Sequence, residues 1–247
     1  MRASAIEFRF RMAINAAIII LGFSSPWINA WGLGQRVPLL EWLALELSRL
    51  GLVRFTVASP IVIAAAASIA AVGAVFRVCG TAYLGPTTVN SLQMRAGAVM
   101  ADGPYRFVRN PLYLGLWCMV AAMAFLMPLT GALVALALLT VFLFRLILGE
   151  EAFLAARLGE SYQHYLRAVP RLIPRFRNPL PSAGTQPDWL RAALVETTSV
   201  GVFVALAVFS WSYDNRLMLR VILIGFGISL ITRALTPGVL VSSDQLD

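Results

Sequence analysis

The run NPLYLGLWCMVAAMAFLMPLTGALVALALLTVFLF, residues 110–144, carries no charged side chain. One helix crosses the hydrocarbon core with about 20 apolar residues, so this run is too long for one crossing and fits two short ones. Its centre, MPLTG at residues 127–131, holds a proline and a glycine that can turn the chain. We therefore predict a tight helical hairpin with spans near 111–127 and 129–148.

The composition extends this prediction to the whole chain. Of the 247 residues, 59% are hydrophobic and 13% charged, and the mean hydropathy is +0.78. A soluble domain cannot carry so much apolar surface, so we predict a single integral membrane domain over residues 1–247. The formal net charge is +8 and every basic residue is arginine. We assign this excess to loops facing anionic headgroups, and not to nucleic acid.

Further apolar windows predict the remaining helices. Alanine-rich residues 54–78 suit close helix packing, and the arginines before the first window precede a retained span, not a cleaved signal peptide. Residues 39–52 mix charges with leucines and predict an interfacial helix. The expected fold is an all-α, polytopic transmembrane bundle of five to six spans. The spans outside the hairpin are expected within 12–33, 54–78, 192–212 and 217–235.

Arginine bias gives the orientation. An N-terminus inside the cell places most arginines on the cytoplasmic side, and few on the other side, chiefly Arg36, Arg49, Arg54 and Arg216. With six spans both termini are cytoplasmic, in what we expect to be a bacterial inner (cytoplasmic) membrane. Residues 103–115 and 149–188 then lie on the same cytoplasmic face.

The first of these segments, GPYRFVRNPLYLG at residues 103–115, combines arginines with prolines. Pro104 and Pro111 stiffen the backbone and disfavour a helix around them, although Pro111 suits the first turn of a helix. Arg106 and Arg109 then lie beside the positive end of the helix dipole. This arrangement predicts a site for a carboxylate or another polar ligand.

The second segment begins with Glu150 and Glu151, where a span reaches the interface. Adjacent carboxylates are costly there unless cationic or hydroxyl groups meet them, but they could equally be solvated residues that start an amphipathic helix. Tyr162 and Tyr165 share one helix face, and we interpret them as interface anchors in preference to ligands. We interpret His164, the single histidine, as an interface residue.

In order along the chain, GPYRFVRNPLYLG, a hairpin, the Glu150–Glu151 pair and LGESYQHYLRAVPRLIPRF (residues 158–176) resemble the isoprenylcysteine carboxyl methyltransferase and phospholipid methyltransferase group of membrane enzymes. The resemblance predicts a methyltransferase-like catalytic core over residues 75–178. Residues 1–74 would add N-terminal spans, and residues 189–247 an additional C-terminal helical pair.

The resemblance implies methyl transfer from S-adenosyl-L-methionine to a lipid or prenylated, hydrophobic acceptor that enters from the bilayer. The cofactor pocket would lie at the cytoplasmic face, between the loop before the hairpin and the segment after it. Arg109 would support the loop, Arg145 would meet the substrate, and Glu150 could also deprotonate the acceptor. The implied cofactor contacts are Ala98, Val99, Met100, Tyr105, Asn110, Pro111, Leu112, Tyr113, Glu150 and Glu151.

Asn110 departs from the family pattern, which usually has histidine at this position. Asparagine can exchange hydrogen bonds with a cofactor but carries no proton near neutral pH, so a general base at this position is excluded. A sulfonium donor brings an activated methyl group, so the reaction needs no metal. The two cysteines, Cys79 and Cys118, support neither a disulfide nor a zinc framework. The sequence gives no sign of an obligate protein partner.

Two other functions stay open. Membrane sterol-type reductases carry a similar arginine–proline–tyrosine stretch and bind NADPH, although they are usually longer. A catalytically inactive membrane scaffold is the non-enzymatic alternative. The sequence does not identify the methyl acceptor.

Overall fold

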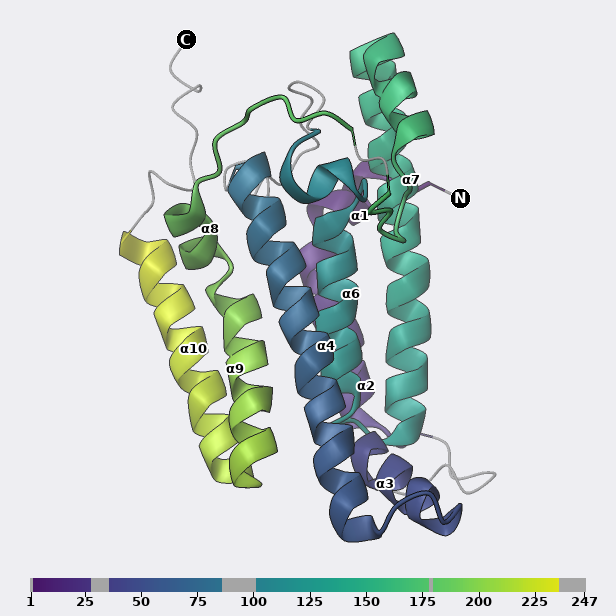
Figure 1. The fold of residues 1–247 in the computed structure, drawn as a ribbon, viewed down its shortest axis with the longest axis vertical. Coiled ribbons are helices and arrows are strands. Elements are labelled where there is room, and N and C mark those ends of the chain that lie inside the picture. Colours follow the sequence, from purple (N-terminus) through teal and green to yellow (C-terminus); the bar gives the residue numbers. More distant parts are fainter. Residues whose placement is uncertain (1, 28–35, 86–100, 178–179, 236–247) are drawn as a thin grey trace.

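The computed structural model describes residues 2–27, 36–85, 101–177 and 180–235, and these contain helices and no β-strand. The helices run side by side in one bundle (Figure 1). This confirms the predicted all-α fold. In chain order the helices are α1 (Ala5–Arg9), α2 (Arg11–Ser24), α3 (Leu39–Arg49), α4 (Phe55–Leu84), the 3₁₀ helix η2 (Gly103–Arg106), α6 (Pro111–Ala124), α7 (Leu129–Ala168), α8 (Trp189–Val195), α9 (Thr197–Ser212) and α10 (Asn215–Leu235).

The predicted hairpin consists of α6 and α7. The indole Nε1 of Trp117 donates a 2.9 Å hydrogen bond to Thr140 Oγ1 across it. The start of α3 covers the turn, where the amide of Leu39 donates to the Met127 carbonyl at 2.8 Å. α3 lies at the end of the bundle away from α1 (Figure 1), as an interfacial helix would.

Glycines allow the helices to approach closely. At the crossing of α4 and α6, a Cβ added to Gly73 would lie 2.9 Å from the Gly115 carbonyl oxygen. Gly131, in the sequence expected to turn the chain, lies inside α7, where its backbone packs against the Gly22 carbonyl of α2. Small residues therefore set the helix spacing, as in other membrane bundles.

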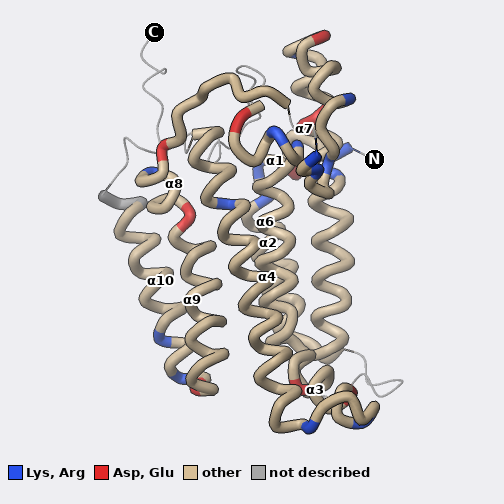
Figure 2. Tube along the Cα trace, in the orientation of Figure 1, with Lys and Arg blue, Asp and Glu red and all other residues tan. Residues whose placement is uncertain are grey.

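Among the described residues, three helices, α4, α7 and α10, are long and apolar enough to cross a membrane, and α8 with α9 forms a fourth candidate bent by 69°. α2 and α6 are apolar but have 14 residues each, about 21 Å of helix, which is shorter than the hydrocarbon core. The number of five to six spans therefore stays a prediction. Most of the charged residues lie toward the two ends of the bundle (Figure 2).

α7 is longer than the predicted span and changes direction at Gly159, where φ is +59° and ψ is −135°. A positive φ of this kind is easy only for glycine. Helix α7 extends beyond its neighbours, and the chain then turns back toward the bundle (Figure 1). This turn brings residues 169–177 back to the loop that precedes α6.

Candidate functional site

The loop between η2 and α6 is held by the segment after α7, on the same end of the bundle. The amide of Arg109 donates to the Pro170 carbonyl at 2.9 Å, and the amide of Arg175 donates to the Phe107 carbonyl at the same distance. Pro104 is accommodated in η2, and Pro111 occupies the first turn of α6. The two segments expected to share a face therefore contact each other directly. The short 3₁₀ helix at Pro104 differs from the prediction that proline disfavours a helix there.

Glu151 is the centre of this contact. Its carboxylate is buried, with 6% of the residue exposed, and accepts hydrogen bonds from Arg171 Nε and Nη2 at 3.1 and 2.8 Å. Arg109 Nη1 lies 3.4 Å from it, and Asn110 Nδ2 lies 3.3 Å from it. Asn110 Nδ2 also donates to the Arg171 carbonyl at 3.1 Å. Glu151 thus joins α7 to the loop on one side and to residue 171 on the other.

Glu150 points in a different direction, because consecutive residues lie about 100° apart around a helix. Its carboxylate interacts with the hydroxyl of Tyr113, in the first turn of α6, and with the charge of Arg11 on α2. The adjacent carboxylates thus have separate surroundings. Glu151 is bound by cations of the loop and of the returning chain, whereas Glu150 faces the start of α6.

The start of α6 offers backbone donors near Glu150. The Asn110 side chain makes no capping hydrogen bond, so the first N–H groups of α6 at Leu112 and Tyr113 have no intrahelical partner. The Nε atom of Arg109 is buried and finds no hydrogen-bond partner within the described part of the chain. Unmatched donors of this kind suit an anionic or oxygen-rich ligand.

Comparison with known proteins agrees with these motifs. Residues 60–161 match the family described as phospholipid methyltransferase. This stretch is therefore similar to members of that family. A curated relative, methanethiol S-methyltransferase of Crocosphaera subtropica (strain ATCC 51142 / BH68), is 41% identical over 70 residues, which are 28% of this chain and 27% of the relative. The alignment therefore spans little more than a quarter of the relative's length. No solved structure matches the chain.

Both matches are to proteins named as methyltransferases, which agrees with the resemblance predicted from the sequence. The match covers α6, the hairpin turn, Glu150 and Glu151, and it ends near Gly159. Arg171, the main partner of Glu151, lies outside the matched residues. Sequence reasoning gave Arg171 no role of its own beyond the arginine bias. Its place in the VPRLIP stretch, within the motif at residues 158–176, was the signal that pointed to it.

The expected substrate contact Arg145 is paired with α1. Its guanidinium donates three hydrogen bonds of 2.9–3.2 Å to the Glu7 carboxylate. These bonds, with the Ser4 amide, lower the pKa of Glu7 to about 2. The pair ties α1 to α7. Residues 98–100, the expected adenine contacts, lie outside the described residues.

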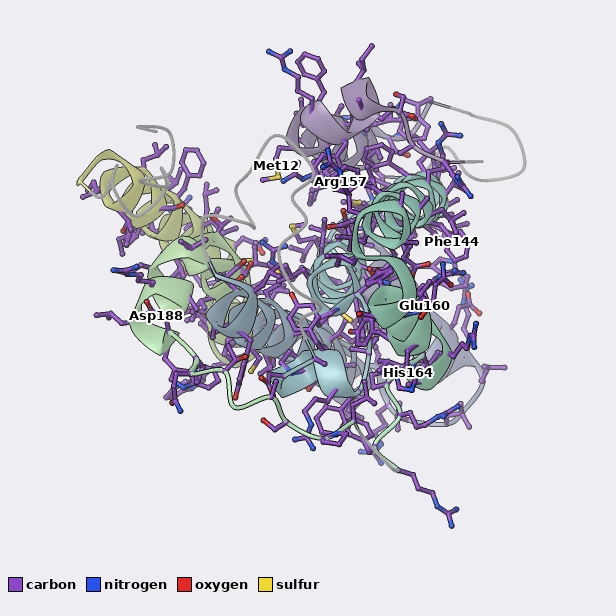
Figure 3. The ribbon with its side chains drawn as sticks, turned by 90° about the horizontal axis from the view of Figure 1, so that it is seen from above. Met12, Phe144, Arg157, Glu160, His164 and Asp188 are labelled. Atoms are coloured by element: carbon purple, nitrogen blue, oxygen red, sulfur yellow. The ribbon has the colours of Figure 1, made fainter. Side chains whose placement is uncertain are left out.

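The interpretation of Tyr162 and Tyr165 as interface anchors was wrong. Both are 5% exposed and pack with Val169 and Leu154 in a small core that the turn at Gly159 creates. The hydroxyl of Tyr165 donates to the Tyr105 carbonyl at 2.9 Å, so it fixes the loop. Tyr105 itself is buried, and its hydroxyl lies 3.4 Å from the Gly80 carbonyl. His164 and Glu160 are both exposed and lie in the last part of α7, where Figure 3 labels them.

Asp102, which the sequence did not single out, ties the segment from Leu180 to Asp188 to the start of the loop. It is fully buried and accepts hydrogen bonds from Ser182 Oγ at 2.5 Å, from the Ala183 amide at 2.8 Å and from the Thr185 amide at 2.9 Å. The hydrogen bonds from Ser182 and Thr185 hold the pKa of Asp102 below its ordinary range. Its ionised form is therefore the form that stabilises the segment.

We expect Asp102→Asn to loosen this segment selectively. Asparagine can still accept from Ser182 and Ala183, but its NH₂ group then faces the Thr185 amide, donor against donor. In hydrogen exchange the Thr185 amide should lose protection while the Ala183 amide keeps most of it. Because the pKa of the folded state is lowered, acidifying the wild type below pH about 4 should begin to have the same effect. Asp214→Asn, at the distant start of α10, is the control, and unchanged exchange at Thr185 in Asp102→Asn would contradict the assignment.

Proposed function

We propose that the chain is an S-adenosyl-L-methionine-dependent methyltransferase that acts at the cytoplasmic membrane face on a hydrophobic acceptor. The observation that carries the proposal is the meeting of Glu150 with the uncapped N-terminus of α6 in the family motif. Glu150 accepts hydrogen bonds and the N-terminus of α6 donates them, although the two lie 37 to 40 residues apart in sequence. A zwitterionic amino-acid moiety and ribose hydroxyls need both kinds of partner.

The donor set fits the cofactor. Glu150 and the Tyr113 hydroxyl suit ammonium or hydroxyl groups. The amides of Leu112 and Tyr113, which have no partner within the helix, and the buried Nε of Arg109 suit a carboxylate. When bound, the cofactor supplies a methyl group already activated by its sulfonium. The chain then has to hold donor and acceptor in line and exclude water, which can supply several kcal/mol.

The other predicted contacts divide by their surroundings. Tyr105, Asn110 and Pro111 lie in or next to the loop and are buried, so we propose that they shape the pocket. The contacts expected at residues 98–100 stay a prediction. Glu151 and Arg109 would act mainly by holding the loop, because Glu151 already binds both Arg109 and Arg171. Arg145 stays a candidate acceptor contact, for which Glu7 would have to release it.

For the acceptor, two classes have support. The family name favours a phospholipid, and the name of the curated relative favours a small thiol. A thiol loses its proton more easily than a hydroxyl or an ammonium group, so its methylation needs a weaker general base. This suits a motif that has Asn110 where the family usually has histidine. Either acceptor is apolar enough to reach the site through the bilayer.

The test is to supply purified protein in lipid nanodiscs with S-adenosylmethionine labelled in its methyl group, adding methanethiol or mixed phospholipids. Label in the lipid extract identifies a phospholipid acceptor, and label in the headspace identifies a thiol. Binding of NADPH with none of the labelled cofactor would favour a reductase and refute the proposal. Binding of neither would support a scaffold.

We expect Glu150→Gln to weaken cofactor binding by about tenfold, since a charge-assisted hydrogen bond is replaced by a neutral one. The side-chain volume is kept, so the melting temperature should change little. Calorimetric titration with S-adenosylmethionine measures the effect. Glu160→Gln, on the exposed surface of the same helix, is the matched control. Equal affinity in both variants would show that Glu150 is a solvated helix residue.

A further inference from the structure

Outside the matched residues, Glu196 is a buried carboxylate at the bend between α8 and α9. Only 1% of it is exposed, and α8 and α9 differ in direction by 69° there. A charge in such a position is retained only when donors surround it. Glu196 accepts two hydrogen bonds from Arg77, through Nε at 2.8 Å and Nη2 at 2.6 Å. Thr81 Oγ1 and Ser199 Oγ complete the set at 2.8 and 2.6 Å.

The bidentate contact fixes the orientation of Arg77, because a planar guanidinium that uses two N–H groups on one carboxylate cannot rotate freely. Nη1 takes no part in this pair, and 21% of the Arg77 side chain stays exposed. Arg77 is therefore held without being fully enclosed.

Arg77 lies next to the family motif. A Cβ on Gly115 would lie 2.8 Å from Arg77 Cγ, so the Arg77 stem packs on α6 just after Tyr113. One turn further along α4, the Gly80 carbonyl meets the Tyr105 hydroxyl. Burial and the charge of Glu150 raise the pKa of Tyr105, and the charge of Arg77 opposes the rise. Arg77 therefore lies one turn from the contact between Gly80 and Tyr105, and it packs on α6 two residues after Tyr113.

We infer that Glu196 is a positioning residue of the methyl-transfer site: it holds the guanidinium of Arg77 beside Tyr105 and Tyr113 to receive an anionic group of the ligand, with the cofactor carboxylate as the expected group. The inference rests on the proposed function and refines it. It also makes α8 and α9 part of the working enzyme, although they lie beyond the residues that match the family.

A purely structural pair and a positioning pair are separated by a double variant. Glu196→Gln leaves Arg77 without its anion, so both thermal stability and affinity for S-adenosylmethionine should fall. In Arg77→Gln/Glu196→Gln the two amides can bond each other without a buried charge, so stability should return. The cofactor affinity should nevertheless stay about tenfold below the wild type, because the positioned cation is gone. Arg191→Gln, which removes an exposed arginine of α8, is the control.

Calorimetry with S-adenosylmethionine and thermal unfolding in the same detergent give both readouts without knowledge of the acceptor. A double variant that regains stability and binds the cofactor as tightly as the wild type would overturn the inference and leave the proposed function intact. If the double variant stays unstable, Arg77→Lys takes its place, because lysine keeps the charge but cannot make the bidentate contact. Normal cofactor affinity in Arg77→Lys would also overturn the inference. Failure of the wild type to bind the cofactor would instead refute the proposed function.

Discussion

Replacing Glu151 with glutamine is expected to cost the protein about 3 kcal/mol of stability and to abolish methyl transfer. The change removes the anion that Arg109 and Arg171 share, and leaves two cations facing each other around a neutral amide. Arg109 is 11% exposed and cannot turn to water, while Arg171, 35% exposed, partly can. This places the expected cost at the lower end of the range for breaking a buried ion pair.

The effect is measured by thermal unfolding in detergent, together with transfer of a labelled methyl group. Glu46→Gln serves as the matched control, because Glu46 pairs with Arg49 at 2.8 Å on an exposed face of α3, where ion pairs contribute little. If Glu151→Gln and Glu46→Gln unfold at the same temperature, the loop is not held through Glu151. Glu151→Asp should show an intermediate loss, since the shorter carboxylate reaches Arg171 less well.

The second large effect is expected for Gly131→Ala. The added methyl group would overlap the Gly22 carbonyl and lie 2.9 Å from Ser25 Cβ, so α2 would have to move away from α7. Overpacking against backbone has no flexible side chain to relieve it, and we expect a loss of about 3 kcal/mol. Hydrogen exchange should show reduced protection in α2 and at the hairpin turn.

Gly227→Ala is the control for this variant. A Cβ at Gly227, inside α10, has no atom within 4 Å among the described residues, and alanine favours a helix more than glycine does. That substitution should be neutral or slightly stabilising. An equally stable Gly131→Ala protein would mean that α2 does not pack on α7 as described.

The positions of the hairpin, the alanine-rich helix and the shared face could be predicted from the sequence, because each follows from where charges, prolines and small residues fall along the chain. The chain-reversing turn at Gly159 could not, since a glycine followed by a helical pattern is also found inside continuous helices. That one residue decides the environment of Tyr162 and Tyr165, and therefore their mistaken interpretation as anchors.

Within the candidate site, sequence identified Arg109, Asn110, Glu150 and Glu151 but not how they pair. The separation of the adjacent glutamates follows from helix geometry once a partner is known, and the partner Arg171 is 20 residues away across the turn. Arg77 and Glu196 are 119 residues apart and join only through packing of α4 against α9. Pairings at such distances are set by tertiary structure, which local patterns do not encode.

These long separations also constrain how the protein can be made. Chains emerge from the ribosome N-terminus first, at about 5–20 residues per second. Arg77 and Arg109 are therefore inserted well before Glu196 and Glu151, the carboxylates that neutralise them. Until those carboxylates are synthesised, the two arginines lie at the membrane without their final partners, and lipid phosphates are the nearest anions. Anionic headgroups would thus affect this protein in two ways. They surround the folded protein, and during folding they neutralise the two arginines before their carboxylate partners arrive.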